Sequence, residues 1–100
     1  MEGIKECHTL QEAREEIDKL DEEIVKLIAK RNAYIKQIAH FKKSIDEIKA
    51  HDRIEDVINR VRAMAIEYDL NPNLINDLYV RMIDGMVESE IAEFTNAQKY

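Results

Sequence analysis

Three polar side chains stand at positions where the helical periodicity of the sequence calls for hydrophobic ones. An apolar residue recurs every three or four positions over residues 10–48, and Arg31 interrupts this stripe. Lys42 follows eleven residues later on nearly the same face, and Glu90 occupies an apolar position in a second stripe nearer the C-terminus. An arginine fork donates two parallel hydrogen bonds to a carboxylate, and a buried acid must be paired or protonated. Cations that converge on an interior with a single acid would therefore form a pocket for a small, multiply anionic ligand.

Each of these residues also has an interpretation without chemistry. Arg31 could set the register of a coiled coil, or bury its stem while its head reaches water. Lys42, and Arg14 near the start of the stripe, could simply be solvated at the edge of the apolar face. Glu90 could form an ion pair with Arg31 or Lys42. The functional alternative for Glu90 is a carboxyl group whose raised pKa lets it donate a hydrogen bond.

The residue types that would support metal or covalent chemistry are scattered. His8, His40 and His51 are dispersed along the sequence, and Cys7 has no second thiol. Neither metal-ligand spacing nor a glycine-rich phosphate loop is present, and no Ser–His–Asp or Cys–His set is legible. We therefore expect no metal, no cofactor and no covalent nucleophile, but a site that works by binding and electrostatics.

The composition is typical of one small helical bundle. Of the 100 residues, 45% are hydrophobic and 36% charged, with two glycines and one proline, so we expect a single domain over residues 1–100. A formal net charge of −6 without a dominant basic patch argues against nucleic acid as a partner. The first residues lack a secretion signal, no apolar stretch approaches membrane length, and Cys7 is alone. We expect a soluble, cytoplasmic protein with no membrane partner.

Three helices account for nearly the whole chain. The first begins at Thr9, which forms a capping-box pattern with Glu12, and its stripe continues without Pro or Gly to about Ile48. A second helix follows a short break, with Asp52 as its predicted cap. Pro72 cannot continue that helix but suits the first position of a third one.

The first helix is far longer than the other two can cover. About forty helical residues would span about 60 Å, and an apolar stripe of that length must be buried. A second copy of the same helix is the economical solution. We therefore predict an all-α fold of three helices, one of them very long, that forms an intertwined helical homodimer. In such a dimer a pocket can draw side chains from both chains.

The run "AREEIDKLDEEIVKLIAKRNAYIKQIAHFK" at residues 13–42 resembles the first helix of the all-helical chorismate mutase class. That class has an Arg near the helix start, I-D-x-[IL]-D three residues on, a second Arg seventeen residues after the first and a Lys eleven further. Here these are Arg14, residues 17–21, Arg31 and Lys42. The later runs "DRIEDVI" and "MIDGMVESEIAEF" extend the likeness over almost the whole chain. Within the class, the lead-in "ECHTLQEAREEID" and the short spacing from Lys42 to Arg53 resemble the small isochorismate-pyruvate lyases.

This resemblance implies a role for individual residues. Arg14 would cross the homodimer interface and hold a carboxylate in the partner's pocket, and Arg31 would hold a carboxylate in the pocket of its own chain. Lys42 would bind a carboxylate and the ether oxygen whose bond breaks, and Arg53 would help to close the entrance. Glu90 falls where the mutases have a Gln that donates to the ether oxygen, which makes Lys42 and Glu90 the expected catalytic pair. The apolar walls would be Ile38, Val57, Ile83 and Val87.

Two further positions depart from the usual mutase pattern. The Asp that contacts the ring hydroxyl of the substrate falls on Ala50, and a Ser or Thr of the third helix falls on Met86. Both departures weaken the case for a mutase. They leave a lyase open, because isochorismate carries its hydroxyl elsewhere on the ring.

The resemblance therefore implies a chorismate mutase, an isomerase that rearranges chorismate to prephenate without a metal or cofactor. An isochorismate-pyruvate lyase that gives salicylate and pyruvate is the alternative. A non-catalytic helical dimerisation module, in which Arg31 merely sets the register, is a third possibility from a different class. For either enzyme the small-molecule partner would be a dicarboxylate, chorismate or isochorismate.

Overall fold

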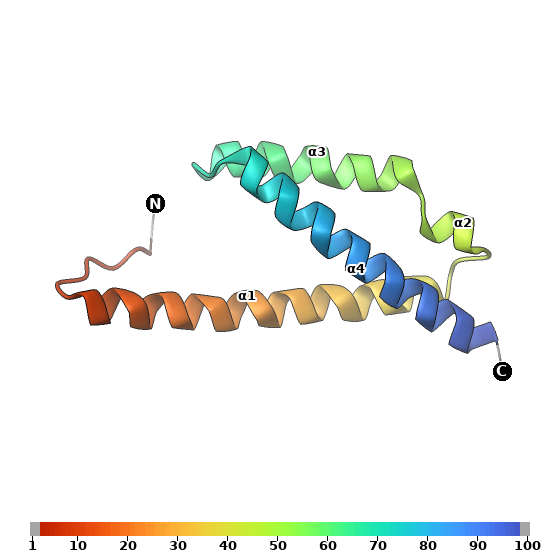
Figure 1. The fold of residues 1–100 in the computed structure, drawn as a ribbon, viewed down its shortest axis with the longest axis horizontal. Coiled ribbons are helices and arrows are strands. Elements are labelled where there is room, and N and C mark those ends of the chain that lie inside the picture. Colours follow the sequence, from red (N-terminus) through yellow and green to blue (C-terminus); the bar gives the residue numbers. More distant parts are fainter. Residues whose placement is uncertain (1–2, 99–100) are drawn as a thin grey trace. The chain divides into compact units, whose positions relative to one another are not determined.

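The computed structural model describes residues 3–98, and all regular structure among them is helical (Figure 1). The elements are α1 (Leu10–Ala39), α2 (Ile45–Ile48), α3 (His51–Glu67) and α4 (Pro72–Gln98). The predicted all-α class is thus confirmed. The chain divides after Ala33 into two compact units.

The first unit holds the N-terminal segment and most of α1. Its helix begins where the sequence predicts, because the Glu12 amide donates to Thr9 Oγ1 over 3.0 Å. The Glu12 carboxylate in turn accepts from the amide of His8, the residue before the cap, over 3.0 Å, so Glu12 also holds the segment that leads into the helix. Lys5 reaches forward to Glu16 at 3.6 Å and ties the N-terminal segment to the helix.

The apolar stripe of α1 is exposed in the single chain. The exposed fraction is above one half for the large side chains of the stripe, which are Leu10, Ile17, Leu20, Ile24 and Leu27. An apolar stripe that stays in water contributes no hydrophobic stabilisation to a single chain.

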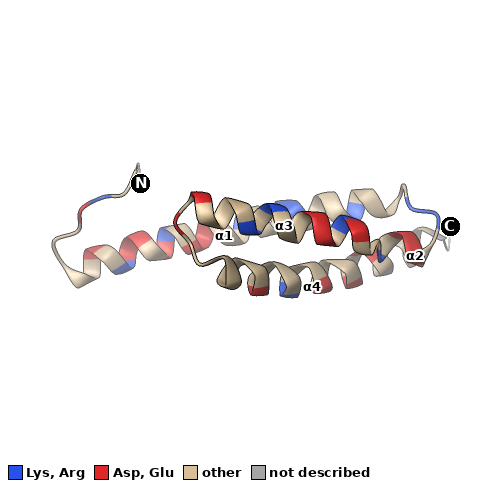
Figure 2. Cartoon of the chain, turned by 90° about the horizontal axis from the view of Figure 1, so that it is seen from above, with Lys and Arg blue, Asp and Glu red and all other residues tan. Residues whose placement is uncertain are grey.

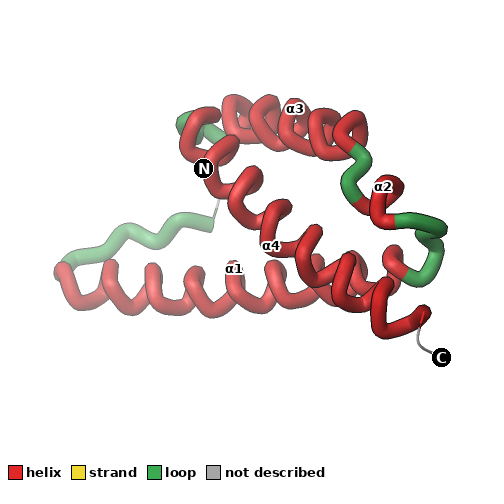
Figure 3. The backbone as a smooth tube through the Cα atoms, turned by 45° about the vertical axis from the view of Figure 1, so that its right-hand side comes forward, coloured by secondary structure: helices red, strands yellow, loops and turns green. Residues whose placement is uncertain are grey.

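The prediction that this helix continues to Ile48 is wrong. The α1 helix ends at Ala39, and residues 40–44 form a turn that leads into α2 (Figure 3). Ser44 takes an extended conformation with φ −155° and ψ 162°, and its hydroxyl accepts from the amide of Glu47. The chain therefore ends one helix and begins another, although apolar residues keep the same helical spacing on both sides of the turn.

The second unit is built on the antiparallel pair of α3 and α4. Its core is formed by Val57, Val61 and Ile83. Other apolar side chains of both helices pack against these three: Ile54, Ile58, Ile75, Tyr79 and Val87. Figure 2 shows that Lys and Arg residues are interspersed with Asp and Glu residues along the helices.

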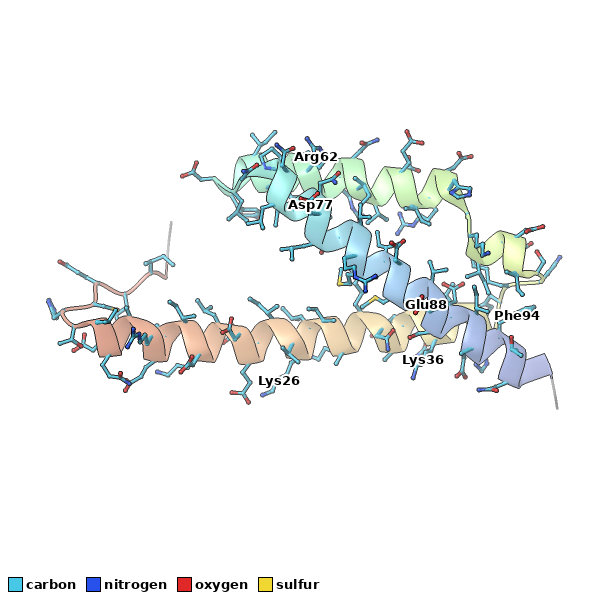
Figure 4. All side chains as sticks on the ribbon, in the orientation of Figure 1. Lys26, Lys36, Arg62, Asp77, Glu88 and Phe94 are labelled. Carbon is cyan, nitrogen blue, oxygen red and sulfur yellow. The ribbon has the colours of Figure 1, made fainter. Side chains whose placement is uncertain are left out.

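Side chains also fix both ends of the α3–α4 connection. Arg62, near the end of α3, donates to the Pro72 carbonyl at 3.3 Å and to Asn73 Oδ1 at 3.4 Å (Figure 4). Between them Asp69 adopts a left-handed φ of 61°, which Asp tolerates better than most residues. Asn71 Oδ1 accepts from the amide of Asn73 at 2.9 Å, so Asn71 and Pro72 begin α4 as predicted.

The start of α3 differs from the prediction. Ala50, not Asp52, is the N-cap, and it has no side-chain capping hydrogen bond. Asp52 lies in the first turn, where its charge favours the helix dipole without capping the chain. Within residues 3–98, no helix combines the length and apolar character that a bilayer crossing requires.

Candidate active site

Glu90 is the buried acid of α4. Its side chain is 5% exposed, and its Oε2 atom has no hydrogen-bond partner. Burial raises the pKa of the Glu90 carboxyl above its ordinary value, and the positive charge of Lys42 acts in the opposite direction. A neutral carboxyl group can donate a hydrogen bond, which a carboxylate cannot. Burial therefore favours the neutral form of Glu90, which is the form that can donate.

The helical spacing of α4 explains why Glu90 is buried. Ile83, Met86 and Glu90 follow one another at steps of three and four, and all three are buried. They share one face of the helix, and that face packs toward α3 and α2. Glu90 is therefore buried because it lies on the same face as apolar residues that pack inward.

Lys42 lies in the turn after α1, where it is half-buried. Its ammonium donates to the backbone carbonyl of Glu47 at 3.1 Å. Within residues 3–98 Lys42 forms no ion pair with Glu90, so of the two ion pairs considered for Glu90 the one with Lys42 is not made. The positive charge is nevertheless near enough to act on the Glu90 carboxyl. Lys42 and Glu90 thus lie within electrostatic reach of each other in the second unit.

Three of the four predicted apolar walls lie together. Val57 and Ile83 belong to the α3–α4 core, and Val87 packs against it. Ile38, in the last turns of α1, is 42% exposed. Arg53 is exposed in the first turn of α3. These placements give Glu90 an apolar neighbourhood along α4 and leave Arg53 accessible.

The two predicted arginine clamps lie on α1. Arg14 is exposed and Arg31 is half-buried. Arg31 follows Arg14 by seventeen positions, which is about 25 Å along the axis at about 1.5 Å per residue. One small ligand cannot touch both arginines of the same helix.

Two surface hollows accompany these residues in the second unit. One of about 420 Å³ is lined by Lys36, Gln37, His40, Phe41 and Glu93. The other, of about 170 Å³, is apolar and is lined by Val61, Met64, Ala65, Tyr68, Leu70, Ile75 and Tyr79. Neither hollow is lined by Lys42 or Glu90. In residues 3–98 no group of His, Cys, Asp and Glu side chains is arranged to hold a metal ion.

Residues 13–91 match the family described as chorismate mutase type II. The matched range covers most of the chain and includes each candidate polar residue from Arg14 to Glu90. The chain belongs to this family. The match confirms the resemblance drawn from the sequence and the enzyme class that it implies.

Two curated relatives of this family member carry different activities in their names. The isochorismate pyruvate lyase of Pseudomonas aeruginosa is 28% identical over 91 residues, which cover 91% of this chain and 90% of the relative. The chorismate mutase of Methanocaldococcus jannaschii is 33% identical over 66 residues, which cover 65% of this chain and 67% of the relative.

Two features of this chorismate mutase family member were not found from its sequence. His40 Nε2 lies 2.9 Å from Glu93 Oε1, a contact between residues 53 positions apart that local patterns do not reveal. Ser44 and Glu47 form a capping box beside Lys42, and their S-x-x-E spacing is a signal that could have been recognised.

Proposed function

We propose that the protein is a chorismate mutase that converts chorismate to prephenate by a pericyclic rearrangement. The observation that carries this proposal is the buried Glu90, whose Oε2 atom is unpartnered and whose pKa is raised, with the cation of Lys42 beside it. The family match supplies the substrate class. The reaction needs no metal, no cofactor and no covalent intermediate, and the candidate residues match those needs.

In this proposal Lys42 and Glu90 act on the ether oxygen of the substrate. Negative charge collects there as the C–O bond lengthens, and two donors placed in advance stabilise it without reorganisation. Lys42 supplies a positive charge, and neutral Glu90 supplies a hydrogen bond. Loss of one such donor typically costs about 3 kcal/mol of barrier, or about a hundredfold to a thousandfold in rate.

Orientation of the substrate falls to the arginines. Arg31 would hold one carboxylate of the compact substrate conformer, and Arg14 of the partner would hold another. Arg53 would help to close the entrance, and the walls would be Ile38, Val57, Ile83 and Val87. The distance of about 25 Å along α1 between Arg14 and Arg31 supports a pocket built from two chains.

We further propose an intertwined homodimer in which a second copy of α1 covers the exposed stripe. The supporting observation is the exposure of Leu10 at 67%, Leu27 at 63% and the large stripe residues Ile17, Leu20 and Ile24 between them. Burial of apolar area contributes about 25 cal/mol per Å², so a stripe of this length favours association. A cytoplasmic location suits this assembly, whose one cysteine, Cys7, is a free thiol.

A second function, isochorismate-pyruvate lyase giving salicylate and pyruvate, is favoured by one specific observation. The relative named as that lyase matches 91% of this chain, whereas the relative named as a mutase matches 65%. The same pocket could serve both reactions, because both substrates are dicarboxylates whose ether C–O bond breaks.

One experiment tests both functions. Purified protein is incubated separately with chorismate and with isochorismate, and the products are analysed for prephenate, salicylate and pyruvate. We expect prephenate from chorismate, at a rate that Lys42→Ala abolishes. Salicylate from isochorismate at a much higher kcat/KM would make the lyase the main activity. Absence of all products would overturn both proposals and favour a dimerisation module.

A further inference from the structure

Lys42 is surrounded by a small set of hydrogen bonds that all involve Glu47. The Lys42 ammonium donates to the Glu47 carbonyl at 3.1 Å, and the Lys43 amide donates to Glu47 Oε2 at 2.6 Å. The Glu47 amide donates in turn to Ser44 Oγ at 3.3 Å. A single residue therefore holds the backbone next to Lys42 through its carboxylate and the ammonium of Lys42 through its carbonyl oxygen.

We propose that Glu47 is a positioning residue for Lys42, and that its carboxylate keeps the ammonium in place for catalysis. The inference rests on the proposed function, because it gives Lys42 the role of a donor to the ether oxygen. Glu47 itself would not touch the substrate. Its effect would pass through the conformation of residues 42–48.

The weakness of α2 explains why a side chain is needed here. The helix has only four residues, and a helix this short is not stable by itself because its nucleation is unfavourable. Two features hold it: Ile48 is buried, with 4% exposure, and its start is capped by the Ser44 hydroxyl and by the Glu47 carboxylate, which accepts from the Lys43 amide. Without the Glu47 carboxylate, the first turn of α2 frays and the carbonyl that holds Lys42 moves with it.

The long side chain of Lys42 explains why its position matters for rate. A lysine ammonium on a flexible four-carbon stem can take many positions, and one of them is a direct ion pair with Glu90. The carbonyl of Glu47 gives the ammonium a fixed acceptor, which leaves Glu90 Oε2 without a partner. The two donors therefore stay separate, as a reaction that uses both of them requires.

Three variants test the proposal: Glu47→Ala, Glu47→Gln and the matched control Asp46→Ala. We expect kcat of Glu47→Ala to fall by at least about tenfold with KM within about twofold, since small misplacements of catalytic groups cost up to about a hundredfold. Glu47→Gln keeps an oxygen that can accept from the Lys43 amide, so its kcat should stay close to that of the wild type. Asp46 lies in the same helix, is exposed and makes no hydrogen bond or ion pair within residues 3–98, so its loss should leave kcat unchanged.

A second measurement, made without substrate, follows the hydrogen bond from the Lys43 amide to the Glu47 carboxylate. Hydrogen exchange of the Lys43 amide, measured by NMR, should be protected in the wild type and in Glu47→Gln and should quicken in Glu47→Ala. Unchanged exchange or unchanged kcat in Glu47→Ala overturns the inference, as does an equal loss of kcat in Glu47→Gln or Asp46→Ala. A wild type that protects the Lys43 amide but converts neither substrate overturns only the proposed function.

Discussion

Replacement of Glu90 by Gln separates the two protonation states that the buried acid can adopt. The carboxyl is 5% exposed and its Oε2 atom has no partner, so the neutral form is favoured and the pKa is raised by burial. Gln has nearly the same shape and donates a hydrogen bond at every pH. Glu90→Gln should therefore flatten the pH profile of the mutase and raise its activity at neutral pH.

The size of this effect follows from the titration of one group. Above the folded-state pKa of Glu90, the fraction that can donate falls by about tenfold for each pH unit. The advantage of Gln grows at the same rate, up to the limit of about a hundredfold to a thousandfold that one donor supplies. The wild type should thus be most active on the acid side, and the two enzymes should diverge as pH rises through the raised pKa.

Stability should change in the same direction. A carboxyl whose folded-state pKa is raised stabilises the fold fully below its ordinary pKa, and this contribution is lost as pH rises through the folded-state value. The wild type should accordingly lose stability at neutral pH relative to acid pH. Glu90→Gln should lose less, and thermal melts at both pH values measure the difference.

The assay is kcat/KM for prephenate formation from about pH 4, near the ordinary pKa of a carboxyl group, to about pH 9. Glu88→Gln is the matched control, because Glu88 lies on the same helix and is exposed (Figure 4). It should leave the profile unchanged. An acid-favoured profile that persists in Glu90→Gln would refute the assignment of Glu90 as the titrating donor.

Three further outcomes are expected. Lys42→Ala should abolish turnover, while circular dichroism shows an intact helical protein. The fold loses only the hydrogen bond from Lys42 to the Glu47 carbonyl, which water can replace. Normal rates in this variant would reject the mechanism. Arg31→Leu should also abolish turnover, whereas a more stable dimer with full activity would mean that Arg31 only sets the register. Ile24→Glu, at a 52% exposed stripe position, should convert the dimer to monomers in analytical ultracentrifugation; a sedimentation coefficient equal to the wild type's would contradict the proposed interface.

The sequence predicted the helices well where one strong signal acts alone. Thr9 and Pro72 mark helix starts that the structure reproduces, because each fixes a local backbone conformation that neighbours do not contest. The turn at residues 40–44 was missed, since apolar spacing continues across it and hides a break in the backbone. The S-x-x-E spacing of Ser44 and Glu47 is a local signal for a new helix start, but the prediction followed the apolar spacing instead.

The same contrast applies to the candidate site. Periodicity alone placed Glu90 on a buried face, and burial is enough to predict that its pKa is raised. The hydrogen bond from Lys42 to a backbone carbonyl depends on the conformation of the turn, and this conformation cannot be predicted from the residue types alone. The contact of His40 with Glu93 depends on how the chain returns after 53 residues, so only the folded structure reveals it.

The order of the elements along the chain also bears on how the protein is made. The ribosome synthesises α1, with its apolar stripe, before the α3–α4 hairpin that contains the packed core. The nascent polypeptide therefore exposes the apolar residues of α1 before the core of α3 and α4 can form, a state that is prone to aggregation. Slow synthesis or overexpression should therefore lower the yield of folded protein more for this chain than for a relative whose core residues are synthesised first.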